Sequence, residues 1–137
     1  MRAPRRAGQS APQAAAGPVL TTEQVGHELG ERATLLQFSS AFCAPCRATR
    51  RILADVAAMA EGVSHIEVDA ESHLDLVREL GVLRTPTVFV LAADGSIIRR
   101  ASGQPRKPDV IAALGIALTG SGADAAAPRS SPSRGTP

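Results

Sequence analysis

Apolar and polar residues follow one another with two different periods along the middle of the chain. Short apolar runs bounded by polar residues predict buried strands, and apolar residues recurring every three or four positions predict amphipathic helices. Gly62 and Gly81 end two of the helical stretches, and Pro108 opens a third. The predicted elements are, in order, a short helix after Thr21, a strand at 34–38, a helix at 45–61, a strand at 64–68, a helix at 69–80, strands at 87–91 and 96–101, and a helix at 108–118.

The order of these elements predicts an α/β fold. Strands separated by helices imply right-handed crossovers and a parallel sheet, and the Ala93-Asp94-Gly95 turn joins the last two strands as an antiparallel hairpin at one edge. Within the helix predicted at 69–80, Leu74, Val77 and Leu80 form the expected inner face. We therefore expect a sheet covered by helices, with hydrophobic contacts made mainly by aliphatic residues.

The two ends of the chain differ from its middle in composition. Residues 1–18 and 119–137 are dominated by Ala, Pro, Gly, Ser and Arg, which cannot bury enough apolar area to offset the entropy of an ordered chain. The 137 residues suffice for one domain of ordinary size. We expect a single domain at 19–118 between two disordered tails.

The charge of the chain excludes some partners. The sequence pI of about 8.9 comes from the tails, because residues 21–118 hold 10 basic and 12 acidic residues. No basic cluster interleaved with aromatic residues is evident, so no nucleic-acid partner is expected. No apolar run is long enough to span a membrane, and 7–20 lacks the continuous apolar stretch of a signal peptide. These patterns predict a cytoplasmic protein without a membrane segment.

The two cysteines of the chain, Cys43 and Cys46, lie directly after a predicted strand and at the start of a long helix. Free N–H groups and the positive end of the helix dipole stabilise a thiolate there, which makes it nucleophilic. The spacing allows the second sulfur to resolve a mixed disulfide. Pro45 supports the first helical turn. Positive charge close to the thiolate can come from three arginines: Arg47, Arg50 and Arg51.

Three other interpretations of the cysteine pair remain open. The pair can be half of a zinc site completed by His65 and His73, but a histidine in a strand and one at a helix start would have to converge on it. An inert pair is disfavoured by the proline between the cysteines. A stable structural disulfide is disfavoured by the expected cytoplasmic location. Redox chemistry is the favoured interpretation, and no metal is expected.

The segment at 36–47, LQFSSAFCAPCR, resembles the strand–CxPC–basic pattern of the thioredoxin family. Thr85-Pro86-Thr87 resembles the cis-proline element of that family, and Gly103 matches a glycine that lines its substrate groove. The resemblance covers about 19–118. It implies the thioredoxin fold, with a central mixed β-sheet flanked by helices and a cis-proline loop opposite the CxxC pair.

The resemblance also implies roles for individual residues. Cys43 would be the attacking thiolate and Cys46 the buried resolving thiol. The bond before Pro86 would be cis, and the backbone of Thr85 would pair with an incoming peptide. The residues implied to contact substrate are Phe42, Ala44, Pro45, Thr85, Pro86 and Gly103.

This chain departs from the family pattern beside the cysteines. Phe42 replaces the common tryptophan and Ala44 the common glycine. Gln37 replaces a buried aspartate that is thought to assist proton transfer at the resolving cysteine, and an amide cannot take up that proton. His65 falls where the family often has a lysine, and it can serve as a substitute base. Gln37 and His65 are therefore the candidates for a proton relay.

The function implied is reduction of protein disulfides through the CxxC dithiol by a cytoplasmic monomer. Electrons would come from a flavin-containing thioredoxin reductase or a low-molecular-weight thiol system. The sequence has no GxGxxG or Walker motif, so no bound cofactor is expected. Two alternatives remain: an extracytoplasmic thiol-disulfide protein for oxidative folding or cytochrome maturation, and a redox-gated protein-binding module.

Overall fold

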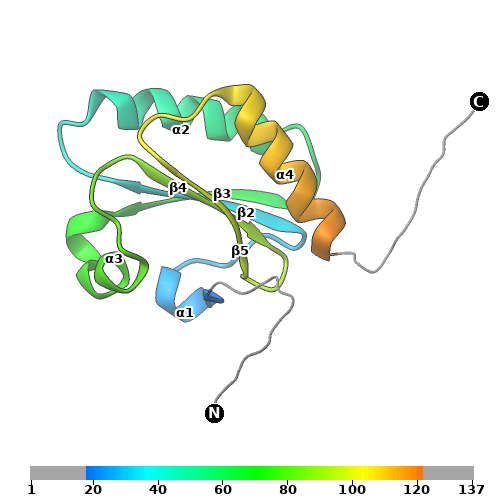
Figure 1. The fold of residues 1–137 in the computed structure, drawn as a ribbon, viewed down its shortest axis with the longest axis horizontal. Helices are drawn as coiled ribbons and strands as arrows, with labels where there is room; N and C mark the ends of the chain where they lie inside the picture. The colour runs from blue at the N-terminus through cyan, green and yellow to red at the C-terminus, as the bar shows by residue number, and fades with distance from the viewer. Residues whose placement is uncertain (1–17, 122–137) are drawn as a thin grey trace, which may run out of the picture.

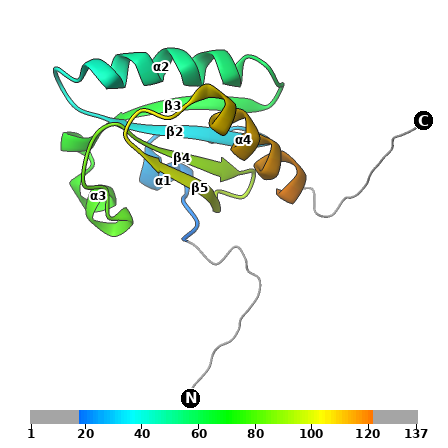
Figure 2. The ribbon, with the colours of Figure 1, turned by 45° about the horizontal axis from the view of Figure 1, so that its top comes forward.

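A four-stranded sheet crosses the middle of the molecule with helices on both of its faces (Figures 1 and 2). The computed structural model describes residues 18–121. The strands are β2 (Ala33–Ser39), β3 (Val63–Asp69), β4 (Thr87–Ala92) and β5 (Ile97–Ser102), in the spatial order β3-β2-β4-β5. The helices are α1 (Thr22–Val25), α2 (Ala44–Ala57), the 3-10 turn η2 (Ala70–Ser72), α3 (Leu74–Leu80) and α4 (Lys107–Ser121).

The expectation of a disordered tail at each end falls almost wholly outside the described residues. α4 continues to Ser121, three residues beyond the end predicted at 118. At the other end, the predicted start of α1 is confirmed in detail. The Thr21 hydroxyl accepts a hydrogen bond from the Gln24 backbone N–H at 3.1 Å, and the Gln24 side chain accepts one from the Thr21 N–H at 3.0 Å. This reciprocal pair is a capping box, which satisfies two donors at the helix start.

The sheet is mixed, and the expectation of a parallel sheet with one antiparallel edge is correct only in part. β2 and β3 are parallel, whereas β4 is antiparallel to both β2 and β5. The reason is the shortness of α3, whose seven residues span only about 10 Å. A helix of that length does not return the chain along a seven-residue strand of about 23 Å. The chain therefore enters β4 at the end of the sheet where β3 finishes.

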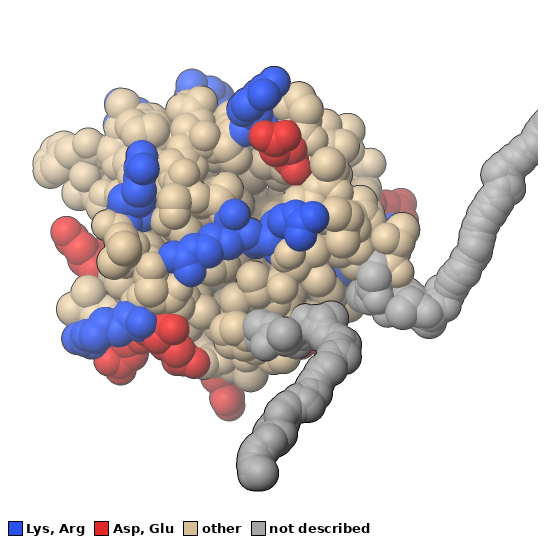
Figure 3. All heavy atoms as spheres, viewed as in Figure 1, with Lys and Arg blue, Asp and Glu red and all other residues tan. Residues whose placement is uncertain are grey.

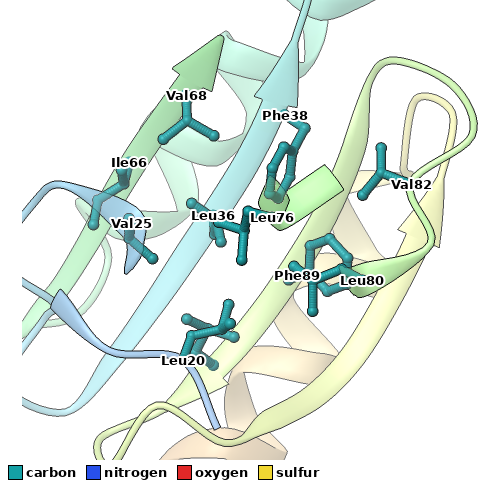
Figure 4. Packing of buried hydrophobic residues seen from close by; sticks show 11 residues of the cluster. Leu20, Val25, Leu36, Phe38, Ile66, Val68, Leu76, Leu80, Val82 and Phe89 are labelled. Atoms are coloured by element: carbon teal, nitrogen blue, oxygen red, sulfur yellow. The ribbon is translucent and has the colours of Figure 1, made fainter. Parts of the chain in front are cut away.

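The central strand β2 is buried along its whole length and supplies two hydrophobic layers. Leu36 and Phe38 pack in the cluster that faces α1 and α3, and Leu35 packs in the cluster that faces α2 and α4. Figure 4 shows the first cluster, in which the rings of Phe38 and Phe89 meet edge to face with centroids 5.6 Å apart. The alternation of side chains along β2 places Gln37 on the α2 side, directly beneath the start of that helix.

Two helix predictions need correction. α2 ends at Ala57 rather than near 61, and the following residues form turns. The helix predicted at 69–80 is divided, because His73 has φ −133° and ψ 49° and separates the 3-10 turn from α3. This break changes which of the following side chains face the core. Leu74, expected to face inward, is 53% exposed, and Leu76 is buried instead.

Arg100 ties β5 to the end of α3. Its guanidinium donates to the carbonyl of Leu80 and, at 2.6 Å, to that of Gly81, and it lies 5.1 Å from the centre of the Phe89 ring. Helix-terminal carbonyls have no partner within their own helix, so this arginine satisfies two of them.

We expect Arg100→Ala to lower the free energy of unfolding by about 1–2 kcal/mol, because two charge-assisted hydrogen bonds are lost. Arg99→Ala is the matched control, since the one hydrogen bond from the exposed Arg99 side chain goes to its own neighbour, the Ile98 carbonyl. Urea denaturation of both variants measures the difference. Equal losses in the two variants would contradict the assigned role of Arg100.

Candidate functional site

The cysteine pair lies at the N-terminus of α2, as the sequence predicts. Cys43 is the residue that caps the helix, and its sulfur is bonded to that of Cys46 with an S–S distance of 2.11 Å. The Cys46 backbone N–H donates to the Cys43 sulfur at 3.2 Å. Cys46 is 1% exposed, whereas Cys43 is half-buried. The outer sulfur is therefore Cys43, and it receives a helix N-terminal donor that stabilises its thiolate.

The cis-proline loop packs against the cysteine loop. The Thr85–Pro86 peptide bond is cis, and the Thr85 hydroxyl lies 2.7 Å from that of Ser40, in the loop between β2 and α2. The Gly103 N–H donates to the Pro86 carbonyl at 2.7 Å, which joins the β5–α4 loop to the same place. Three loops thus meet beside the cysteines, and Gly103 has the positive φ of 88° that its turn requires.

The backbone of Thr85 is open to a partner. Within residues 18–121 its N–H and C=O make no hydrogen bond, whereas the neighbouring carbonyls of Arg84 and Pro86 are both occupied. An extended peptide can pair with such an edge by strand addition. Pairing of Thr85 with a substrate peptide stays a prediction of the resemblance to thioredoxins.

Two large apolar side chains beside these loops face solvent. Phe42 is 103% exposed and has a positive φ of 59°, which is uncommon for a residue other than glycine. Its ring is therefore almost wholly open to solvent. Leu83, between the end of α3 and the cis-proline, is 93% exposed. Sequence reasoning did not single out Leu83, and the available signal was an apolar residue two positions before Thr85.

Gln37 lies between His65 and the helix turn that carries Cys46. It is fully buried, and its Nε2 donates to the Cys46 backbone carbonyl and to the Ser39 hydroxyl, both at 2.9 Å. Its Oε1 is 3.1 Å from His65 Nε2. Because an amide oxygen only accepts, His65 donates from Nε2. The structure thus brings the two relay candidates together, with His65 connected to Cys46 through the amide of Gln37.

Glu67 completes this network, and sequence reasoning missed it. Its Oε2 accepts from the Ser39 hydroxyl at 2.7 Å and lies 3.4 Å from Gln37 Nε2. Arg50 reaches the same carboxylate with Nε at 2.6 Å and with a terminal nitrogen at 2.9 Å. The hydrogen bond from Arg50 holds the pKa of the Glu67 carboxyl below its ordinary value of 4.5.

The register explains how Glu67 could have been found. Gln37 and Glu67 are direct partners across the parallel β2–β3 pair, so two polar residues at matching positions of adjacent strands are the available signal. The ion pair also changes the expectation for Arg50. Its guanidinium is engaged by Glu67 on β3, which leaves Arg47 and Arg51 as the exposed cations at the start of α2 that make no ion pair among the described residues.

The burial of His65 predicts a pH dependence of stability. Desolvation is the main cause that lowers the pKa of His65 from its ordinary 6.5. The unfolded chain then binds the proton more readily, so the free energy of unfolding is fully retained above the unfolded pKa and decreases as the pH falls below it. We expect His65→Gln to flatten the decrease between about pH 7 and about pH 5, measured by urea denaturation. An unchanged slope would contradict the burial of a neutral imidazole.

The described residues offer no alternative site for a metal. Among residues 18–121, no three His, Cys, Asp or Glu side chains are grouped closely enough to hold an ion. His73, the second histidine of the zinc interpretation, donates from Nδ1 to the Asp69 carbonyl at 3.0 Å. In the same part of the chain, the helices are too short or too polar to cross a bilayer.

The arrangement of the site determines its chemical class. An outer cysteine at a helix N-terminus, a buried partner cysteine and an adjoining cis-proline loop point to a thiol-disulfide oxidoreductase. The sequence model of the thioredoxin family matches residues 19–115, which is more than half of the chain. The chain belongs to the thioredoxin family.

Similar proteins agree with this assignment. Human thioredoxin domain-containing protein 2 is 37% identical over 60 residues, which are 44% of this chain and 11% of the human protein. A thioredoxin from Nicotiana alata superposes with a TM-score of 0.57 at 20% identity, covering 64% of this chain and 75% of that one. Spinach chloroplast thioredoxin f superposes with a TM-score of 0.56 at 22% identity, covering 64% and 78%. These structures establish the thioredoxin fold.

Proposed function

We propose that this protein reduces disulfides in other proteins, as a cytoplasmic monomer. The observation that carries the proposal is the asymmetry of the cysteine pair: Cys43 is accessible beside the open Thr85 backbone, and Cys46 is buried behind it. A nucleophile must reach the substrate, and the resolving thiol must reach only the nucleophile. Both conditions are satisfied by the positions of the two sulfurs.

The reaction begins with the reduced dithiol. The Cys43 thiolate attacks one sulfur of a substrate disulfide, forming a mixed disulfide and releasing the other substrate sulfur as a thiolate. Cys46 then loses its proton and attacks the Cys43 sulfur, which releases the second substrate thiolate. Two electrons pass to the substrate, and the protein is left with the Cys43–Cys46 bond seen in the structure. A thioredoxin reductase or a low-molecular-weight thiol would restore the dithiol.

Each neighbour of the pair supports one part of this cycle. The Cys46 N–H at the Cys43 sulfur favours the thiolate that attacks. The Thr85 backbone and the exposed Phe42 ring offer a substrate peptide both hydrogen bonds and apolar contact. Gln37 donates to the Cys46 carbonyl, so it helps to position the resolving cysteine. Because an amide does not take up a proton, the proton of the Cys46 thiol goes to another acceptor.

Insulin reduction tests the proposal. With NADPH and a bacterial thioredoxin reductase as donor, the protein should precipitate insulin chains catalytically, and NADPH consumption should equal the disulfide reduced. Dithiothreitol serves as a second electron donor, because it reduces the protein even if the bacterial reductase does not recognise it. Failure with both donors would contradict the proposal and favour a redox-gated binding module, in which the cysteine state controls docking without turnover.

A further inference from the structure

Charge is distributed unevenly around the cysteines. The residues 40–51 and 81–87 are joined by the Ser40–Thr85 contact, and together they hold four arginines and no acidic residue. The described chain as a whole has 10 basic and 12 acidic residues, so its acids are concentrated elsewhere. Figure 3 shows a different face, on which basic side chains cross the middle of the molecule over β5. Glu67 on β3 neutralises Arg50, so Arg47, Arg51 and Arg84 leave these loops positive on a domain that is slightly negative.

Arg84 is the arginine in the cis-proline loop itself. A Cβ added to Gly103 would lie 3.1 Å from a terminal nitrogen of Arg84, so the guanidinium rests against this glycine. Gly103 is in turn bonded through its N–H to the Pro86 carbonyl. Arg84 thus borders the place where the cis-proline loop meets the β5–α4 loop, next to the open backbone of Thr85.

The charge of Arg84 is not neutralised within the domain. Its side chain is exposed and makes no ion pair or hydrogen bond with any of residues 18–121. Other arginines of the domain are engaged: Arg50 by Glu67, Arg78 by Asp75, and Arg100 by the carbonyls that end α3. An exposed guanidinium that borders a peptide-binding edge favours carboxylates, because its fork of N–H groups matches their two oxygens.

We propose that Arg84 selects protein segments in which an acidic residue lies beside the reacting cysteine. A strand that pairs with Thr85 places a neighbouring residue opposite Arg84, with its side chain on the same face of the ladder. A glutamate or aspartate at that position meets the guanidinium, while the exposed Phe42 and Leu83 accept apolar residues. The inference specifies which substrates the proposed reductase would prefer. Any effect of this preference on disulfide reduction rests on the proposed function.

Peptide binding tests the selection without requiring turnover. Two fluorescent peptides carry serine in place of cysteine and differ only in Glu or Gln beside it, and their affinities for the oxidised protein are compared at low salt by anisotropy. We expect the Glu peptide to bind about 3- to 10-fold more tightly. Arg84→Gln should reduce the ratio to about one, and Arg84→Glu should shift the preference to a Lys peptide. Arg78→Gln, on α3, should leave the ratio of the parent protein unchanged.

Equal affinities of the parent protein for the two peptides, a preference that survives Arg84→Gln, or no measurable binding would overturn the proposal. Tighter binding of a single-stranded oligonucleotide than of the Glu peptide, lost in Arg84→Gln, would also overturn it and assign Arg84 to nucleic acid. The same peptides with cysteine disulfides test the proposed function separately. If neither is reduced while the binding preference holds, the reductase proposal fails and the selection by Arg84 stands.

Discussion

Replacing Cys46 by serine should trap the protein on its substrate, whereas replacing Cys43 should abolish capture. Attack requires only the accessible sulfur, and release of the mixed disulfide requires the buried one. The reduced Cys46→Ser variant mixed with insulin should therefore form a covalent adduct that is stable on a non-reducing gel and linked through Cys43 by mass spectrometry. Both variants should lose catalytic insulin reduction, down to the uncatalysed rate given by dithiothreitol alone.

The double variant is the control for adducts formed by other means. The two cysteines are the only ones in the chain, so Cys43→Ser with Cys46→Ser should form no adduct at all. If the adduct forms with Cys43→Ser and fails with Cys46→Ser, the roles of the two sulfurs are reversed. Such a result would contradict the assignment, from burial, of Cys43 as the nucleophile and Cys46 as the resolving thiol.

Gln37→Glu should be strongly destabilising near neutral pH and less so in acid. The substitution keeps the shape of the side chain but replaces a donor, which serves Cys46 and Ser39, by a carboxylate beside Glu67. We expect a loss of about 3–5 kcal/mol at about pH 7, because the buried carboxylate would lie beside that of Glu67 with the His65 N–H as its neighbouring donor. Burial raises the folded-state pKa of the new group above its unfolded value, so the stability is present at low pH and lost as the pH rises through that pKa.

Gln37→Met separates the charge from the lost hydrogen bonds. It leaves the Cys46 carbonyl without the amide donor but introduces no ionisable group, and it should cost about 1–3 kcal/mol without the new pH dependence. Urea denaturation between about pH 5 and about pH 8 measures both variants. Equal losses in the two, independent of pH, would show that only packing and hydrogen bonding matter at this position.

Comparison of Gln37→Glu with the parent protein also tests the chemistry of the thiols. With a neutral amide at 37, Cys43 should be alkylated with a simple dependence on pH. In Gln37→Glu, the carboxylate couples to the cysteines, so the profile should broaden and the resolution of the mixed disulfide should accelerate. Profiles that superimpose would contradict a proton-transfer role for this position.

The sequence was sufficient for those features that depend on local pattern. The CxxC pair at a strand–helix junction and the capping box at Thr21 follow from spacing and residue type alone. The placement of His65 beside Gln37 followed from the resemblance to thioredoxins and the pairing of their two strands. The direction of β4 did not follow, because it depends on how far α3 carries the chain, and the break at His73 shortens that helix.

Side-chain pairings across elements were also beyond the sequence pattern. Arg50 lies three positions from Arg47, and nothing in the spacing shows that Arg50 forms an ion pair with β3 while Arg47 forms none among the described residues. The pairing depends on the carboxylate of Glu67 on β3, which contacts Ser39 of β2 and Arg50 of α2. Likewise, the contact of Arg84 with Gly103 joins residues on separate loops, so the selective group at the site could be found only from the structure.

The equilibrium reduction potential of the Cys43–Cys46 pair tests the central claim most directly. The fraction of oxidised protein would be measured by alkylation and mass spectrometry across a series of glutathione redox buffers. The account predicts a potential near or below the cytosolic poise of about −220 to −260 mV, because a disulfide reductase must give its electrons away there. A potential near about −120 mV, typical of strong oxidants of protein folding, would contradict it.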